Sequence, residues 1–255
     1  MPMYRRPRPL NPSDHGDWKL ADTTDWSFAA GEMLVPIVLT EIADVAREYP
    51  IIFVKGTNQP HALLGVEPGQ NAYVDAAGHW LSVYIPARLR AYPLSLSPVP
   101  GKPEEFAIGI DEEAPQCQGA SGYRLFEDRQ PSVCLKQRMD LLKRIRATEA
   151  TTAAMVRVLQ DAGVLIDRNI NVNNAGPDGH SLGGMQVVDE AKLNALPHEA
   201  FAALRDKGVL PLVYAHLLSM ANLRQGAIAG KYPQLTQQKQ DVLSAMLQSD
   251  TIKFN

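Results

Sequence analysis

Cysteine is scarce in this chain of 255 residues, which contains only Cys117 and Cys134. The two do not have the short spacing of zinc-ligand pairs, and two cysteines cannot form the disulfide framework of small secreted domains. We therefore expect neither a disulfide scaffold nor a structural zinc ion. A reducing cytoplasm is the simplest location for such a chain.

Long apolar runs and an excess of positive charge are also missing. No stretch approaches the roughly 20 apolar residues of a membrane-spanning helix, and the charged first residues are not followed by the apolar segment of a signal peptide. We expect no membrane span and no export signal, which again favours a cytoplasmic protein. The net charge of −3 gives no reason to expect nucleic acid as a partner.

Motifs for cofactors and metals are absent as well. The sequence has neither the glycine-rich dinucleotide fingerprint nor a P-loop. None of its histidines stands at metal-ligand spacing from another histidine or a cysteine. The histidines are His15, His61, His79, His180, His198 and His216. The sequence therefore predicts no cofactor and no metal site.

The patterns that are present predict an α+β protein. Residues 1–32 are basic and proline-rich and are expected to form an irregular arm. Residues 33–230 are expected to form one domain, with a mostly antiparallel sheet in 33–128 and a helical half in 131–230 packed on it. Residues 231–255 are expected to carry an amphipathic tail helix at 235–249, a candidate contact for a homodimer.

Local signals place the individual elements. Runs of β-branched and aromatic residues between turn signals predict strands, and apolar residues at helical spacing predict helices. Residues 95–105, with several prolines and a glycine, predict a loop. The expected strands are 51–54, 61–66, 106–110, 123–126 and 184–188, and the expected helices are 34–48, 131–146, 151–161, 190–196, 197–207 and 211–229.

The most informative stretch is residues 71–94. It predicts a hairpin whose turn contains Gly78, because glycine accepts a positive φ, and whose return strand is 80–85. Alternation would place Leu81, Val83 and Ile85 on the core face. Trp80 and Tyr84 would then lie on the opposite face, either covered by another element or available to a ligand.

A short basic segment follows the predicted hairpin. Its guanidinium groups stand beside phenols, a combination that can hold an anion, a carboxylate or the face of a sugar. A solvated edge with half-buried tyrosines explains the same residues. The candidate ligand-binding residues are His79, Trp80, Tyr84, Arg88, Arg90 and Tyr92.

Residues 84–93 read Tyr-Ile-Pro-Ala-Arg-Leu-Arg-Ala-Tyr-Pro, which resembles the central motif of the bacterial SapC family. Further similar stretches follow the family order between about residues 34 and 223. They are Val35-Pro36 with Glu41, residues 49–53, Leu64-Gly65, residues 71–75, Gly78-His79-Trp80, Gly109-Ile110-Asp111, Leu125-Phe126, Pro131-Ser132, residues 187–190 and residues 210–219. The chain departs from the family pattern at Ala91 and Leu94, where the family has an arginine and a phenylalanine, so its basic cluster is weaker than the family's. A second departure is Arg129-Gln130, which replaces a glycine-containing turn of the family.

The resemblance implies a non-catalytic binding or accessory protein connected with surface molecules. The family name refers to surface-layer-associated proteins, and its transporter-permease namesake does not fit a chain without apolar spans. The implied partners are a flavin-dependent halogenase-like protein or another enzyme that modifies surface molecules, a surface receptor, or a peptide or glycan ligand. Surface association itself is implied only by the family name.

Two enzymatic alternatives remain open. In the first, Arg88, Arg90 and Tyr84 hold an anionic substrate while His79 or Asp75 moves a proton. In the second, residues 179–183, which read Gly-His-Ser-Leu-Gly, form the nucleophile elbow of a serine hydrolase. Such an elbow needs a strand before the serine and a helix after it. Here a loop precedes the serine and a strand follows, which favours a glycine-rich turn.

Overall fold

The computed structural model describes residues 3–99, 101–119, 121–171 and 181–233, and it confirms an α+β protein with antiparallel sheets. The larger sheet has the strand order β11-β12-β4-β5-β3. Its strands are β3 (Leu34–Pro36), β4 (Ile51–Val54), β5 (Pro60–Leu63), β11 (Leu165–Asn171) and β12 (Ser181–Val188). Because β11 and β12 follow the long helix in sequence, both halves of the chain build this sheet.

A second sheet has the order β1-β7-β6, and two short strand pairs lie beside it. Its strands are β1 (Pro7–Pro9), β6 (Leu94–Val99) and β7 (Lys102–Asp111). The short pairs join β2 (Lys19–Leu20) to β8 (Tyr123–Arg124) and β9 (Phe126–Glu127) to β10 (Gln130–Pro131). The N-terminal segment thus supplies an edge strand, since β1 pairs with β7.

The loop expected at 95–105 is wrong, because these residues form the β6–β7 hairpin. Gly101 turns the hairpin with a φ of 76°. Pro98 has no N–H to donate. It lies in β6, an edge strand of the sheet, where the side of the strand that faces solvent needs no donor.

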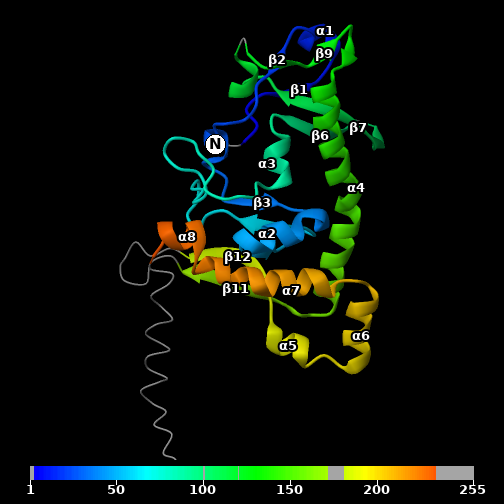
Figure 1. The fold of residues 1–255 in the computed structure, drawn as a ribbon. Helices are drawn as coiled ribbons and strands as arrows, with labels where there is room; N and C mark the ends of the chain where they lie inside the picture. Colours follow the sequence, from blue (N-terminus) through cyan, green and yellow to red (C-terminus); the bar gives the residue numbers. More distant parts are fainter. Residues whose placement is uncertain (1–2, 100, 120, 172–180, 234–255) are drawn as a thin grey trace, which may run out of the picture.

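One helix, α4 (Val133–Asp161), is 29 residues long and runs past both sheets (Figure 1). It begins at the N-cap Ser132, whose hydroxyl accepts from the backbone N–H of Leu135 at 3.2 Å. Separate helices at 131–146 and 151–161 were expected, and that division is wrong. The residues between them, Ala-Thr-Glu-Ala, contain no helix breaker, so the helix continues through them.

The other helices are short. They are α1 (Pro12–His15), α2 (Ile42–Glu48), α3 (Ala87–Ala91), α5 (Glu190–Asn194), α6 (His198–Asp206), α7 (Leu210–Ser219) and α8 (Gly226–Lys231), with 3-10 turns at Ser27–Ala29, Leu39–Glu41, Pro115–Cys117 and Met220–Leu223. Helices α5 and α6 confirm the expected ones at 190–196 and 197–207. The helix expected at 34–48 begins only at residue 42, because 34–36 form β3. The helix expected at 211–229 is divided into α7, a 3-10 turn and α8.

Two clusters of buried apolar side chains form the core, and α4 contributes to both. Leu135, Leu142 and Ile145 from its first half pack near α3 and the second sheet. Val156 and Leu159 from its second half pack with the larger sheet. The long helix therefore joins the two parts of the molecule, and α3 lies beside its first half (Figure 1).

No helix in the described part of the chain is long and apolar enough to cross a membrane. Within the same residues, no three histidine, cysteine or acidic side chains are grouped to hold a metal ion. The tail helix expected at 235–249 lies outside the described residues. The division into arm, domain and tail, and the homodimer through the tail, stay predictions.

Candidate functional site

The centre of the site is the loop that connects β5 to α3. Its turn is as predicted: Gly78 has a φ of 82°, and the Asp75 carboxylate accepts from the backbone N–H groups of Ala77 and His79 at 2.9 and 2.8 Å. The return strand expected at 80–85 is wrong, because only one bridge, Val74 to Trp80, joins the two sides of the turn.

The Glu48 side chain explains why no strand forms. Its carboxylate accepts from the backbone N–H groups of Val83 at 2.8 Å and Tyr84 at 3.2 Å, the donors that a partner strand would have used. Two of the three aliphatic side chains that alternation assigned to the core face water. The exposed fraction is 95% for Val83 and 54% for Leu81, so the assignment is wrong for these two, whereas Ile85 is half-buried and packs against the core.

Arg88 and Arg90 both belong to α3, but they point to different sides of it. Side chains two positions apart in an α-helix diverge by roughly 200° around its axis. Arg88 lines a cavity of about 240 Å³, and Arg90 lines another of about 490 Å³. We call these the Arg88 cavity and the Arg90 groove. The two arginines that the sequence analysis grouped together therefore line two separate hollows.

The Arg90 groove lies between α3, α4 and the start of α2. The Arg90 guanidinium is held in place, because its Nε donates to the Ile85 carbonyl at 2.9 Å and its Nη2 donates to the Tyr84 hydroxyl at 3.1 Å. It also lies 5.2 Å from the centroid of the Tyr84 ring. The facing side chains are Thr40, Leu141, Arg144, Ile145 and Thr148.

A buried carboxylate supports this groove from beneath. Glu41 accepts from the Tyr84 hydroxyl at 2.9 Å, from the Ala87 backbone N–H at 2.7 Å and from the Val38 backbone N–H at 3.2 Å. Burial raises the pKa of Glu41 even though these donors oppose the shift. Burial, followed by the nearby Glu41 charge, also raises the pKa of Tyr84. The Glu41 carboxylate and the Tyr84 hydroxyl thus already form hydrogen bonds within the protein.

The Arg88 cavity lies on the other side of α3, between α4 and β6. Arg88 pairs with one carboxylate oxygen of Glu149, and Arg146 pairs with the other at 3.0 Å. The Arg88 Nε–H is buried and has no acceptor among the described residues. Tyr4, from the N-terminal segment, also lines the cavity, and its hydroxyl donates to the Leu94 carbonyl at 3.0 Å.

Two of the candidate aromatic residues are committed to packing. Tyr92 is buried, donates to Asp111 at 2.9 Å and stacks on Phe28 with the ring centroids 4.1 Å apart. The Trp80 indole donates to the Tyr49 hydroxyl at 2.9 Å, and its ring lies among neighbouring aromatic rings. The sequence left open whether Trp80 is covered by another element or available to a ligand. In the structure it is half-buried and packs against the core.

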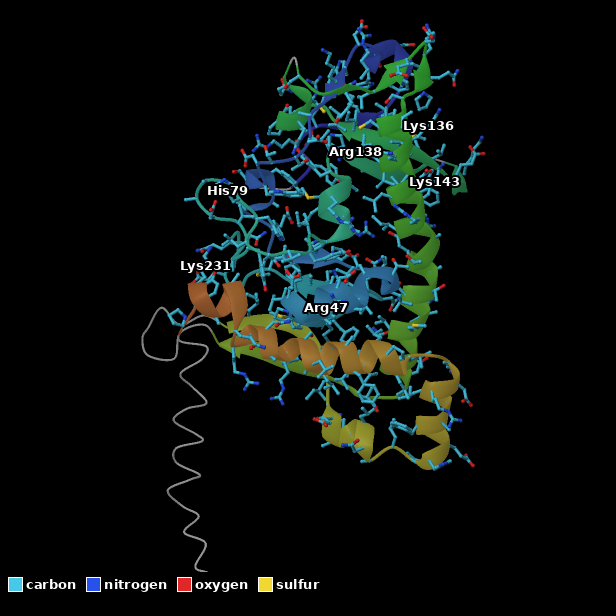
Figure 2. The ribbon with its side chains drawn as sticks, in the orientation of Figure 1. Arg47, His79, Lys136, Arg138, Lys143 and Lys231 are labelled. Carbon is cyan, nitrogen blue, oxygen red and sulfur yellow. The ribbon has the colours of Figure 1, made fainter. Side chains whose placement is uncertain are left out.

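His79 stands apart from the other candidates. It lies in the β5–α3 loop, on the side of the molecule opposite α4 (Figure 2). Its side chain is 70% exposed and contacts Asp75, with 3.1 Å between Nδ1 and Oδ2. The structure therefore brings together Tyr84 and Arg90, and it separates both from His79.

Sequence reasoning missed the carboxylates and the facing arginine of the site. Glu48 and Glu149 hold candidate residues in place, and Arg144 faces Arg90 across the groove. The available signal was the seven-residue separation of Glu41 and Glu48, which places both on one face of a helix. Glu149 and Arg144 come from α4, and no local pattern relates that helix to α3.

The serine motif at residues 179–183 lacks the context of a nucleophile elbow. Residues 179 and 180 lie outside the described residues, and Ser181 is the first residue of β12, which continues as a strand to Val188. His216, a histidine that follows Ser181 in the sequence, has both ring nitrogens within hydrogen-bond distance of backbone groups. Nδ1 lies 2.7 Å from the Ile51 carbonyl oxygen, and Nε2 accepts from the Val188 N–H at 3.0 Å.

Comparison with protein families matches residues 10–225 to SapC. Comparisons with curated proteins and with solved structures give no match. The matched range contains the β5–α3 loop, α3 and the whole of α4, so all residues that line the two hollows lie within it except Met3 and Tyr4. Since the match covers most of the 255 residues, the chain belongs to the SapC family.

Proposed function

We propose that this SapC-family protein is a non-catalytic binding protein whose Arg90 groove holds an acidic peptide segment of a partner protein. The observation that carries the proposal is the pair Arg90 and Arg144, which line one groove from two different helices. Two guanidinium groups on opposite walls suit the carboxylates of an extended chain between them.

The chemistry of the two arginines supports this assignment. Arg90 is oriented by bonds through Nε and Nη2, so its Nη1 donors are left for a ligand. Arg144 is exposed, and its guanidinium has no hydrogen bond or ion pair within the described part of the chain. Leu141 and Ile145 add apolar contacts, and Thr148 adds a hydroxyl. A preorganised cation beside apolar surface is typical of peptide recognition.

The enzymatic alternative has less support. It needed Arg88 and Arg90 to hold one substrate, yet they line different hollows. Two carboxylates, Glu41 and Asp44, line the groove. Asp44 pairs with Arg47 at 3.4 Å, and the Glu41 oxygens already accept three hydrogen bonds from the protein. A general acid or base must reach the proton it transfers, and Glu41 has little free bonding capacity for that task.

The proposal also fits the surface connection that the family name implies. A partner that modifies or receives surface molecules would carry the peptide segment, and this protein would hold that partner. A halogenase-like enzyme and a surface receptor are the two partner classes that we propose. In this scheme the present chain performs its binding role in the cytoplasm.

A fluorescein-labelled peptide with four consecutive glutamates tests the proposal by fluorescence polarisation. We expect saturable binding that Arg144→Ala weakens at least about tenfold, since two charge-assisted bonds are lost. Lys143→Ala is the matched control, because Lys143 is exposed on the side of α4 away from α3 (Figure 2) and pairs with Asp140 at 3.3 Å. Equal losses in both variants, or tighter binding of tetragalacturonate than of the peptide, would contradict the proposal.

A further inference from the structure

The Arg88 cavity is lined by a guanidinium that is held in place. One Nη2 bond ties Arg88 to Glu149, and the Nε–H is buried without a partner among the described residues. The Arg88 side chain as a whole is 33% exposed and lines the cavity. Because hydrogen bonds to charged groups are stronger than neutral ones, the cavity offers the charge of a fixed guanidinium to an anionic ligand.

The charges around this donor favour an anion. Arg88 and Arg146 share the single carboxylate of Glu149, so these three side chains together carry one positive charge. Arg146 is also fixed by the Phe106 ring, with its Cζ 4.3 Å from the ring centroid. Two oriented guanidinium groups with one counterion match a ligand that carries a single negative charge.

The other walls of the cavity are apolar. They are formed by Leu96 and Phe106 of the second sheet and by Leu142 and Ile145 of α4. Tyr4 closes one side through its bond to the Leu94 carbonyl, and burial raises the pKa of Tyr4 to about 12, so its phenol stays neutral. A volume of about 240 Å³ holds a small molecule but not a folded peptide segment.

We propose that the Arg88 cavity is a second ligand site, separate from the Arg90 groove, which binds a small molecule with one carboxylate and an apolar chain. The ligand carboxylate lies against the Arg88 guanidinium, and the chain lies against Phe106 and Leu96. This inference is independent of the acidic peptide proposed above, because the two sites lie on opposite sides of α3.

The test is isothermal titration with hexanoate and with its neutral analogue hexanamide. We expect saturable binding of hexanoate and at least about tenfold weaker binding of hexanamide, since the charge-assisted bond is lost. Arg88→Lys replaces the planar guanidinium with an ammonium group on a shorter side chain and should weaken hexanoate binding by at least about tenfold. The matched control is Arg47→Lys, the same change at an exposed arginine of α2 that lines neither hollow, which should change hexanoate binding by less than about twofold.

A second variant keeps the test decisive if Arg88→Lys does not fold. Leu96→Trp, from the edge strand β6, fills the cavity without removing a charge and should abolish hexanoate binding. Any of three results would overturn the proposal. They are no saturable binding to the wild-type protein, equal binding of hexanamide, and hexanoate binding that survives both the Leu96→Trp change and the Arg88→Lys change.

Discussion

Glu41, the residue before α2, and Glu48, the last residue of α2, hold the chain from Val83 to Ala87 by its backbone. Glu41 accepts from the N–H of Ala87 at 2.7 Å, and Glu48 accepts from the N–H of Val83 at 2.8 Å. Carboxylates that accept backbone N–H donors form strong, charge-assisted hydrogen bonds. The segment between the Gly78 turn and α3 is thus held by the two glutamates and needs no neighbouring strand.

This arrangement predicts a coupled effect on stability. Glu48→Leu removes the acceptor of the Val83 and Tyr84 N–H groups and should lower the free energy of unfolding by about 1–2 kcal/mol, because water can replace the acceptor at the exposed Val83. Glu41→Leu should cost a similar amount. The double variant should fall short of the sum by at least about 0.5 kcal/mol, because both residues hold the same loop.

Urea unfolding at neutral pH measures these changes. The control is Arg47→Ala on the outer side of α2 (Figure 2), which we expect to change stability by no more than about 0.5 kcal/mol because its side chain is 73% exposed. Strict additivity of the two glutamate variants would show that the two ends of α2 act separately.

His216 predicts a loss of stability in acid. It is buried and neutral, with Nδ1 donating to Ile51 and Nε2 accepting from Val188, and burial lowers its pKa from 6.5 to about 4. Because the unfolded chain binds the proton more tightly, stability is full above about pH 6.5 and decreases as the pH falls toward 4. His61, whose pKa burial also lowers to about 4, acts in the same direction.

For His216 alone, the loss between pH 7.5 and pH 5 should be about 2 kcal/mol. Comparing urea unfolding at the two pH values for wild type and His216→Gln isolates this contribution, since glutamine does not titrate. Leu218→Ala, at an exposed residue of the same helix, provides the comparison, because it removes no titratable group. A His216→Gln protein with the wild-type pH dependence would refute the assignment.

Tyr92 and Asp111 predict a second pH effect. Burial opposes ionisation of Asp111, but the backbone N–H groups of Arg5 and Arg6 and the Tyr92 hydroxyl outweigh it and hold its pKa below the usual value. This stabilisation is present above the unfolded pKa of about 3.8 and is lost as the pH falls through the lower folded pKa. Removing a donor weakens it.

Tyr92→Phe should therefore lower the free energy of unfolding at pH 7 by about 1–2 kcal/mol and raise the pKa of Asp111. Thermal or urea unfolding gives the first quantity, and carboxyl carbon NMR titration of Asp111 gives the second. Tyr123→Phe, at a tyrosine that is 56% exposed, serves as the reference variant. An unchanged Asp111 titration in Tyr92→Phe would contradict the role of the hydroxyl.

Salt dependence distinguishes charge recognition in the Arg90 groove from apolar contact. Raising the salt concentration from 0.05 to 0.5 M should weaken binding of the tetraglutamate peptide severalfold, because salt screens exposed charges. Arg144→Ala should reduce this dependence, whereas Lys143→Ala should retain it. Peptide binding that is insensitive to salt in the wild-type protein would argue for recognition by Leu141 and Ile145 alone.

The sequence was most informative where one residue determines the local geometry. Gly78 adopts the positive φ that its turn needs, and Ile51 to Phe53 form a buried strand, as the apolar run predicts. The 80–85 strand failed for a non-local reason. Its alternation was real, but Glu48 from another element occupies the N–H groups that a sheet would use.

The site residues show the same limit. In an extended segment, Arg88 and Arg90 would point to the same side and form one cluster with Tyr84 and Tyr92. Residues 87–91 instead form a helical turn, which sends the two arginines to different hollows. The sequence thus identified side chains of the right chemistry, but their grouping depended on the local backbone and on α4.

The position of β4 between β5 and β12 has a consequence for synthesis on the ribosome. β4 and β5 leave the ribosome early, whereas β12 follows only after the whole of α4 and β11. Until then, one edge of β4 has no strand beside it, and such edges attract other chains. Nascent chains stalled before β12 should therefore need a chaperone to stay unaggregated, while chains that extend past it should not.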